Sequence, residues 1–348
     1  MKGNALLYWF LWFLIVNVFV DEAQINTISS VNKVLQAFES GFDPEVYQNI
    51  TEVISSKGYT SEEHYVTTKD GFILCIIRIL PKCHVASGRQ KVVFLQHGLL
   101  DSAHTWVNNL PDESLGFILA DDCYDVWLGN SRGSTYSSNH QYLKPDDKEF
   151  WEFSWDEMGK YDLPATLIYI LNYTNAEKLS YIGHSQRQLL TLVQLKVLYV
   201  ILHHLQKQSN QLLNGLEMVN FYLQSRLPIY VAHTPAGTSV QNMVHYCQGI
   251  VTDRFQKYDY GPTKNLQIYN QSYPPLYNIS QLKIPIIIYY GGHDWLASYN
   301  DVHKLIKQIN YTISSIHYFP EYNHLDFVWG LNAGKLLYPL ILKQLSKV

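Results

Sequence analysis

The chain has 348 residues, of which 47% are hydrophobic and 16% are charged, and this is enough apolar material for one large core. Its 26 basic and 30 acidic residues give a formal net charge of -4 at pH 7. This balance argues against a nucleic-acid-binding protein, which would need a basic surface. Aromatic residues make up 14% of the chain; they can build the core or line the apolar pocket that a large ligand requires.

The chain begins with the pattern of a secretory signal peptide. Lys2 precedes an apolar run over residues 5–16. A positive start followed by a short apolar run predicts a signal peptide over residues 1–20, with cleavage after Val20 or Ala23. An uncleaved membrane anchor is the alternative, but the run is short for a bilayer span. We therefore expect no stable transmembrane span after signal removal, and a protein that is secreted or lysosomal, since both routes begin with such a signal.

Two further features concern covalent modification. Sequons of the form Asn-X-Ser/Thr fit a secreted chain; the glycosylation candidates are Asn49, Asn270, Asn278 and Asn310. A fifth sequon at Asn172 is less certain because its apolar neighbours could be buried. Four cysteines allow three disulfide pairings, between which the sequence does not choose: Cys75, Cys83, Cys123 and Cys247. The cysteines and histidines lack metal-ligand spacing, so we expect no metal site.

Predicted strands and helices alternate along the chain. An Asp-Gly turn at 70–71 lies between two β-rich runs, which is a strong signal for a hairpin. Further strands are expected at 91–96, 124–129, 179–183, 284–290 and 316–319, and helices at 114–120, 156–171 and 300–309. Such alternation predicts an α/β fold with a mostly parallel sheet flanked by helices. In such sheets, functional sites form at the carboxyl ends of the strands.

A candidate nucleophile elbow occupies residues 183–186, with the sequence Gly-His-Ser-Gln. It follows a predicted strand and precedes a helix candidate, as the sharp turn that exposes a nucleophilic serine requires. Asp294 and His324 each follow a later predicted strand, which gives the chain order Ser, acid, His of the α/β-hydrolases. In this interpretation Ser185 is the nucleophile, His324 is first base and then acid, and Asp294 orients the imidazole.

Other residues compete for these roles. Asp326 lies two positions after His324 and is the alternative carboxylate. His293, beside Asp294, is expected to be structural, and His184 to pack under the elbow.

Acyl transfer also needs backbone N–H groups directed at the developing oxyanion. One should belong to Gln186, which follows the nucleophile, and the other to the loop after an earlier strand. This loop has the sequence His-Gly-Leu-Leu at 97–100, and Leu99 is the expected donor. The alternative for the His-Gly pair is an ordinary turn.

Several long motifs point to a known family. They are Asp43-Pro44-Glu45, Asp70-Gly71-Phe72-Ile73-Leu74, the runs 93–100, 124–133 and 156–165, Pro235-Ala236-Gly237-Thr238-Ser239-Val240-Gln241-Asn242, and Tyr322-Asn323-His324-Leu325-Asp326-Phe327. In these motifs the chain resembles the acid lipases, the group of gastric and lysosomal acid lipases, over about residues 43–186 and 228–343.

The resemblance implies the α/β-hydrolase fold and cleavage of triacylglycerols or cholesteryl esters at a lipid-water interface without a cofactor. It also implies Ser185, Asp294 and His324 as the catalytic residues, with Leu99 and Gln186 as oxyanion donors. Members of the family work in acidic settings.

The chain departs from the family directly after the serine. The family's elbow reads Gly-His-Ser-Gln-Gly, and Arg187 stands in place of the last glycine. A bulky side chain there is expected to force the turn apart, and a displacement of about 1 Å can reduce the rate on the order of a hundredfold. A cation near a helix N-terminus is also disfavoured by the helix dipole.

The following segment is also unlike the family. Residues 187–233 are expected to form a shortened cap-like insertion in an α/β-hydrolase domain of residues 21–348. Most of the family's lid and its disulfide are expected to be missing. Within this insertion, Gln188 to Gln208 is rich in Leu and Val and is expected to be a buried helix. Loss of the cap should expose an apolar pocket. The alternatives to an active lipase are therefore a catalytically impaired, lipid-binding pseudoenzyme and a truncated variant that folds poorly.

Overall fold

The computed structural model describes residues 43–83, 90–185, 198–201, 226–279, 282, 284–309 and 312–347. The expected signal peptide lies outside this part of the chain, as do Gln186, Arg187 and Asn310. No helix within the described residues is long and apolar enough to cross a bilayer.

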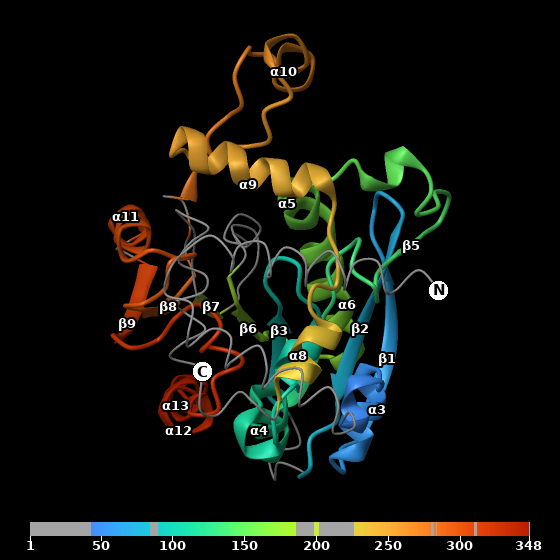
Figure 1. Cartoon of the computed structure of the whole chain (residues 1–348), viewed down its shortest axis with the longest axis vertical. Coiled ribbons are helices and arrows are strands. Elements are labelled where there is room, and N and C mark those ends of the chain that lie inside the picture. Colours follow the sequence, from blue (N-terminus) through green and yellow to red (C-terminus); the bar gives the residue numbers. More distant parts are fainter. Residues whose placement is uncertain are drawn as a thin grey trace, which may run out of the picture.

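A mixed sheet forms the centre of the molecule (Figure 1). Its strands run in the order β1-β2-β4-β3-β6-β7-β8-β9, with the short β5 paired to β2. They are β1 Ser61–Thr67, β2 Phe72–Ile79, β3 Val92–Gln96, β4 Asp125–Gly129, β5 Asn139–His140, β6 Ser180–Gly183, β7 Leu198–Ile201, β8 Ile286–Gly291 and β9 Ile313–Phe319. The β1–β2 hairpin is antiparallel, as its Asp-Gly turn predicted, and every pair from β4 to β9 is parallel. The predicted parallel sheet is thus confirmed.

Helices cover both faces of this sheet. One face carries α3 Ile50–Ser56, α4 Leu115–Asp121, α12 Ala333–Leu336 and α13 Tyr338–Leu345, whose apolar side chains pack with those of the strands. The other carries α6 Leu163–Thr174, which continues from α5 Trp155–Glu157 through a π-helical turn, and α11 Tyr299–Ile309. Burial of β3 on both faces agrees with its nearly all-apolar sequence.

Between β7 and β8 in the sequence, the described residues form three more helices. They are α8 Leu227–His233, α9 Val240–Thr252 and α10 Pro262–Tyr269. Helices α9 and α10 lie beyond one end of the sheet (Figure 1). The bounds of the cap-like segment expected over residues 187–233 stay a prediction.

The helix expected over Gln188 to Gln208 is wrong at residues 198–201. This stretch is strand β7, which pairs in parallel with β6 on one side and with β8 on the other. A short apolar run fits a buried helix and a buried strand equally well, so periodicity alone could not separate them. The strand conformation is determined here by pairing, because β7 lies between β6 and β8 and joins them into one sheet. The rest of the expected helix lies outside the described residues.

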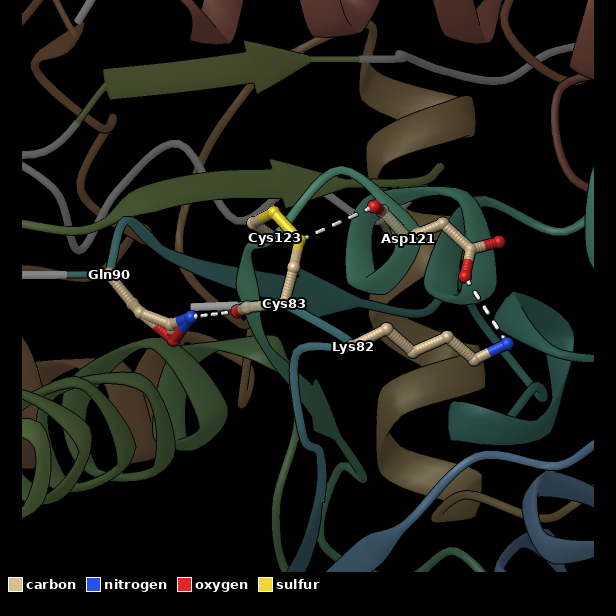
Figure 2. Close-up of a disulfide and its surroundings, with 5 residues drawn as sticks. All are labelled: Lys82, Cys83, Gln90, Asp121 and Cys123. Atoms are coloured by element: carbon tan, nitrogen blue, oxygen red, sulfur yellow. Dashed lines mark hydrogen bonds and ion pairs between the residues drawn. A yellow bond between two sulfur atoms is a disulfide. The ribbon is translucent and has the colours of Figure 1, made fainter. Parts of the chain in front are cut away.

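A disulfide joins Cys83, just after β2, to Cys123, in the turn after α4 (Figure 2). The sequence left this pairing open. The two cysteines are 40 residues apart in the chain, and their Cα atoms are 5.2 Å apart. Cys75 and Cys247 are free, the former buried and the latter exposed. Because disulfides persist in oxidising compartments, this bond fits the expected secretory route.

The described glycosylation candidates lie on the surface. Asn49, Asn270 and Asn278 are all exposed. Asn172, the less certain candidate, is exposed on α6 as well, and its neighbour Tyr173 is 49% exposed. Glycosylation of these sites stays a prediction.

Candidate active site

Ser185 lies at a sharp turn directly after β6. Its φ of 64° falls in the left-handed region, which non-glycine residues rarely adopt and which is often strained at functional sites. The loop after β3 comes very close to this turn at Gly98. A Cβ atom added at Gly98 would lie 2.8 Å from the Cβ of Ser185, so the approach depends on glycine at that position.

Three predicted residues meet at the carboxyl ends of β6, β8 and β9. The Nε2 atom of His324 lies 2.6 Å from the hydroxyl oxygen of Ser185. On the other side of the ring, Nδ1 lies 3.0 and 3.2 Å from the two carboxylate oxygens of Asp294. Both Asp294 and His324 are buried.

Asp294 determines which nitrogen of the His324 imidazole carries the proton. The carboxylate accepts the backbone N–H groups of Leu296 and Ala297, at 2.9 and 2.6 Å, which orient it. A carboxylate at Nδ1 of His324 requires the proton on that nitrogen, so Nε2 is the atom that accepts. The arrangement can therefore take a proton from the hydroxyl of Ser185.

The competing residues have other partners. Asp326 accepts the backbone N–H of Asn323 at 2.7 Å and so closes the turn that carries His324. Burial raises the pKa of Asp326 to about 6. The backbone N–H of His293 donates to Tyr322. The carboxylate that reaches the imidazole of His324 is Asp294.

The loop after β3 is shaped by a buried histidine. Nδ1–H of His97 donates to the carbonyl of Gly98 at 2.7 Å, and Nε2 accepts the backbone N–H of Ser131 at 3.0 Å. Burial lowers the pKa of His97 to about 4, so the ring is neutral and its tautomer is set by these partners. Leu100 has a φ of 62°, and its carbonyl accepts the backbone N–H of Ala236 at 2.6 Å. Leu99, the expected oxyanion donor, is in this loop; Gln186 lies outside the described residues.

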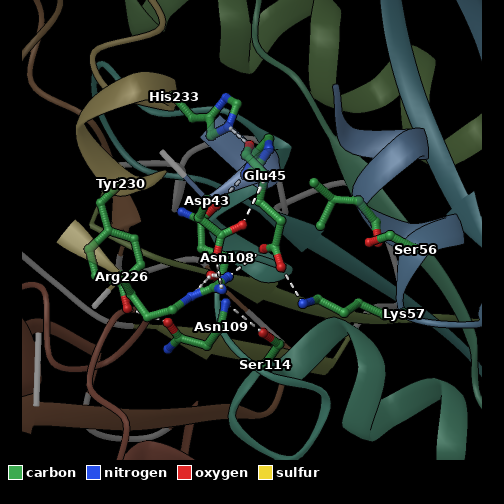
Figure 3. Close-up of polar contacts among 12 residues, drawn as sticks. Asp43, Glu45, Ser56, Lys57, Asn108, Asn109, Ser114, Arg226, Tyr230 and His233 are labelled. Atoms are coloured by element: carbon green, nitrogen blue, oxygen red, sulfur yellow. Dashed lines mark hydrogen bonds and ion pairs between the residues drawn. The ribbon is translucent and has the colours of Figure 1, made fainter. Parts of the chain in front are cut away.

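A buried ion pair fastens the start of α8 to the N-terminal segment (Figure 3). The guanidinium of Arg226 donates to the carboxylate of Glu45 at 2.5 Å and to the carbonyl of Asn108 at 3.0 Å. Lys57 contacts the other carboxylate oxygen of Glu45. Burial alone would raise the pKa of Glu45, but the hydrogen bonds from Arg226 and Lys57 outweigh it and lower the pKa.

Further contacts in the same region link α8 to the chain between β3 and α4. The ring of His233 stacks on that of His104 with centroids 3.5 Å apart. Burial, followed by the nearby His233, lowers the pKa of His104 to about 3. Asp101 accepts the backbone N–H of Ser102 and the hydroxyl of Thr234, and burial raises its pKa to about 6. Sequence reasoning missed these contacts; Asp43-Pro44-Glu45 was noticed only as a family motif.

The chain is similar to known α/β-hydrolase lipases. Residues 50–110 match the family model described as a partial alpha/beta-hydrolase lipase region, and residues 91–186 match the alpha/beta hydrolase fold. The human (Homo sapiens) lysosomal acid lipase/cholesteryl ester hydrolase is 40% identical over an alignment 372 positions long, which covers 88% of this chain and 92% of that protein. The gastric triacylglycerol lipase of Bos taurus is 36% identical and covers 97% and 99%, respectively.

Solved structures confirm the α/β-hydrolase fold. A putative lipase from Acinetobacter baumannii superposes with a TM-score of 0.53 at 13% identity, covering 88% of this chain and 98% of that one. An esterase from Pyrococcus furiosus gives a TM-score of 0.50, also at 13% identity, covering 84% and 92%. At such low identity these likenesses concern the fold alone.

Proposed function

The chain belongs to the lipase family of lysosomal acid lipase and gastric lipase, and from this premise we propose that it hydrolyses neutral lipid esters with Ser185, His324 and Asp294 as catalytic residues. The observation that carries the proposal is the 2.6 Å contact between Nε2 of His324 and the hydroxyl of Ser185. A hydroxyl becomes an effective nucleophile only when a positioned base takes its proton.

The reaction follows from this contact. His324 takes the proton of Ser185 as the serine oxygen attacks the ester carbonyl carbon, and Asp294 stabilises the imidazolium that forms. The tetrahedral intermediate collapses when His324 gives the proton to the departing alcohol, which leaves an acyl group on the serine. Water then attacks this acyl-enzyme by the same route, releases the fatty acid and regenerates the hydroxyl.

The negative oxygen of each tetrahedral intermediate needs two N–H donors. We assign these to Leu99 and Gln186. The close approach of Gly98 to Ser185 supports the first, because it brings the loop containing Leu99 to the nucleophile. For the second, support comes from chain position, since the N–H after the nucleophile has this role in α/β-hydrolases.

The substrate class comes from the relatives. One is named a cholesteryl ester hydrolase and another a triacylglycerol lipase, so we propose these neutral esters, presented at a lipid-water interface, as substrates. The same names and the Cys83–Cys123 disulfide support a secreted or lysosomal protein that is made with a signal peptide. The exposure of the sequon residues Asn49, Asn270 and Asn278 supports the proposal that it is glycosylated.

Arg187 favours a second candidate, a lipid-binding protein with little turnover. It occupies the position at which the family has glycine, and displacement of the elbow would reduce catalysis without abolishing lipid binding.

Turnover by the purified protein tests both candidates. Nitrophenyl esters of short and long acyl chains should be hydrolysed in acid and at neutral pH, with Ser185→Ala as the background. Arg187→Gly should raise kcat if the arginine disturbs the elbow. A wild-type rate no greater than that of Ser185→Ala would exclude the lipase proposal, and saturable fatty-acid binding without turnover would then favour the second candidate.

A further inference from the structure

His184 connects the nucleophile elbow to the loop that carries His324. It directly precedes Ser185 in the sequence, and its backbone N–H donates to the carbonyl of Gln96, at the end of β3, at 3.0 Å. Its side chain is buried, with Nε2 2.9 Å from the backbone carbonyl oxygen of His324. One residue therefore contacts the central strands and the histidine loop.

The direction of this hydrogen bond is unambiguous. A carbonyl oxygen only accepts, so Nε2 of His184 carries a proton and donates it. Burial, followed by the nearby His324, lowers the pKa of His184 to about 3, so the ring is a neutral Nε2–H tautomer in mild acid. Its Nδ1 faces Gly98, where an added Cβ would lie 3.3 Å away, and has no hydrogen-bond partner among the described residues.

The loop that carries His324 is thus held from two sides. Asp294 binds the imidazole at Nδ1, and His184 binds the backbone carbonyl of the same residue. Asp326 closes the loop locally, but the bond from His184 connects it to the strand that presents Ser185. Without this donor, the carbonyl of the buried His324 would lose its hydrogen-bond partner, which is unfavourable unless the loop moves towards water.

We propose that His184 is a positioning residue that keeps His324 within hydrogen-bonding distance of Ser185 through its Nε2–H donor to the carbonyl of His324. Its effect on turnover rests on the proposed function; its effect on geometry does not. A shift of about 1 Å in a reacting group can cost on the order of a hundredfold in rate. What matters in this role is the position of the N–H donor, and not a change in the protonation of the imidazole.

Three substitutions separate the effect of the N–H donor's position from that of side-chain size. His184→Leu removes the donor but keeps an apolar side chain, His184→Gln places an amide N–H near the position of Nε2, and His184→Asn carries the same amide on a shorter side chain. Relative to wild type, we expect kcat for a soluble nitrophenyl ester to fall on the order of tenfold to a hundredfold in the Leu and Asn variants, with KM changed much less. The Gln variant should recover most of this loss.

Each outcome bears on the proposal. Equal losses in the Gln and Asn variants, or wild-type kcat in the Leu variant, would overturn it. If the Leu variant does not fold, the Gln and Asn pair still decides. Wild-type turnover equal to that of Ser185→Ala would instead refute the lipase function. In that case crystal structures still test the inference: the distance from Ser185 Oγ to His324 Nε2 should stay near the wild-type 2.6 Å with Gln and lengthen with Asn. An unchanged distance in the Asn variant would overturn it.

Discussion

Replacing both Cys83 and Cys123 by serine should destabilise the protein by about 4 kcal/mol. The bond closes a loop of 40 residues, and the chain-entropy relation gives roughly 13 cal/mol/K for a loop of that length, or about 4 kcal/mol at room temperature. Neighbouring contacts add little to this figure. Lys82, for example, forms a 3.4 Å ion pair with Asp121, but both side chains are substantially exposed, at 45% and 48%, and such surface pairs contribute little (Figure 2).

Urea unfolding of the double variant and of wild type under oxidising conditions measures this difference. With an unfolding entropy of roughly 0.7 kcal/mol/K for a chain of this length, the melting temperature should fall by about 6 °C. Cys247→Ser is the matched control, because it removes an exposed free thiol and closes no loop. Adding a reductant should lower wild-type stability to that of the double variant. The loop-closure reasoning is wrong if the double variant and wild type have the same unfolding free energy while peptide mapping shows the wild-type bond to be formed.

Three other substitutions test electrostatics and packing in different parts of the protein. Burial raises the pKa of Asp156 to about 7, so folding favours its protonated form, and the free energy of unfolding falls as pH rises from about 4 towards 7. This fall should be absent in Asp156→Asn, whose urea midpoint should exceed that of wild type at neutral pH but not in acid. Arg226→Met leaves the carboxylate of Glu45 without its main partner and should cost about 3–5 kcal/mol in urea unfolding, with part of the loss recovered when Glu45→Gln is added; a loss below about 1 kcal/mol would contradict this. Gly98→Ala places a methyl group 2.8 Å from the Cβ of Ser185 and should lower kcat on the order of a hundredfold with a smaller change in KM; wild-type kcat would show that the loop can move at no cost.

The sequence predicted the features that depend on local patterns. The Asp-Gly hairpin and the buried parallel strands follow from turn chemistry and from short apolar runs. The meeting of Ser185, Asp294 and His324 could be anticipated for the same reason. Each follows a predicted strand, and the carboxyl ends of parallel strands share one edge of a sheet. Their catalytic roles stay a prediction.

Features that depend on contacts between distant segments were not predictable. Strand β7 is identified by its pairing with β6 and β8, and its own sequence suits a buried helix as well. The partner of Cys83 is fixed by the way the turn after α4 returns to the end of β2. Similarly, Arg226 and Glu45 are 181 residues apart in the chain, and no periodic pattern connects positions so far apart.

The shifted titrations also bear on the stability of this fold in mild acid. Burial raises the pKa of Asp101 and of Asp326 to about 6, so for these groups the native state binds protons more tightly and stability falls as pH rises above about 4. Burial has the opposite effect on histidine: it lowers the pKa of His97 to about 4 and that of His184 to about 3, so below about pH 6.5 the unfolded state binds more protons and stability rises with pH. Between about pH 4 and 6 the two slopes oppose each other, so these four groups together should change the free energy of unfolding little across this range. Urea midpoints measured through this range test the balance. A steep loss of stability towards pH 4 would mean that the buried histidines dominate and that the carboxyl groups do not offset them.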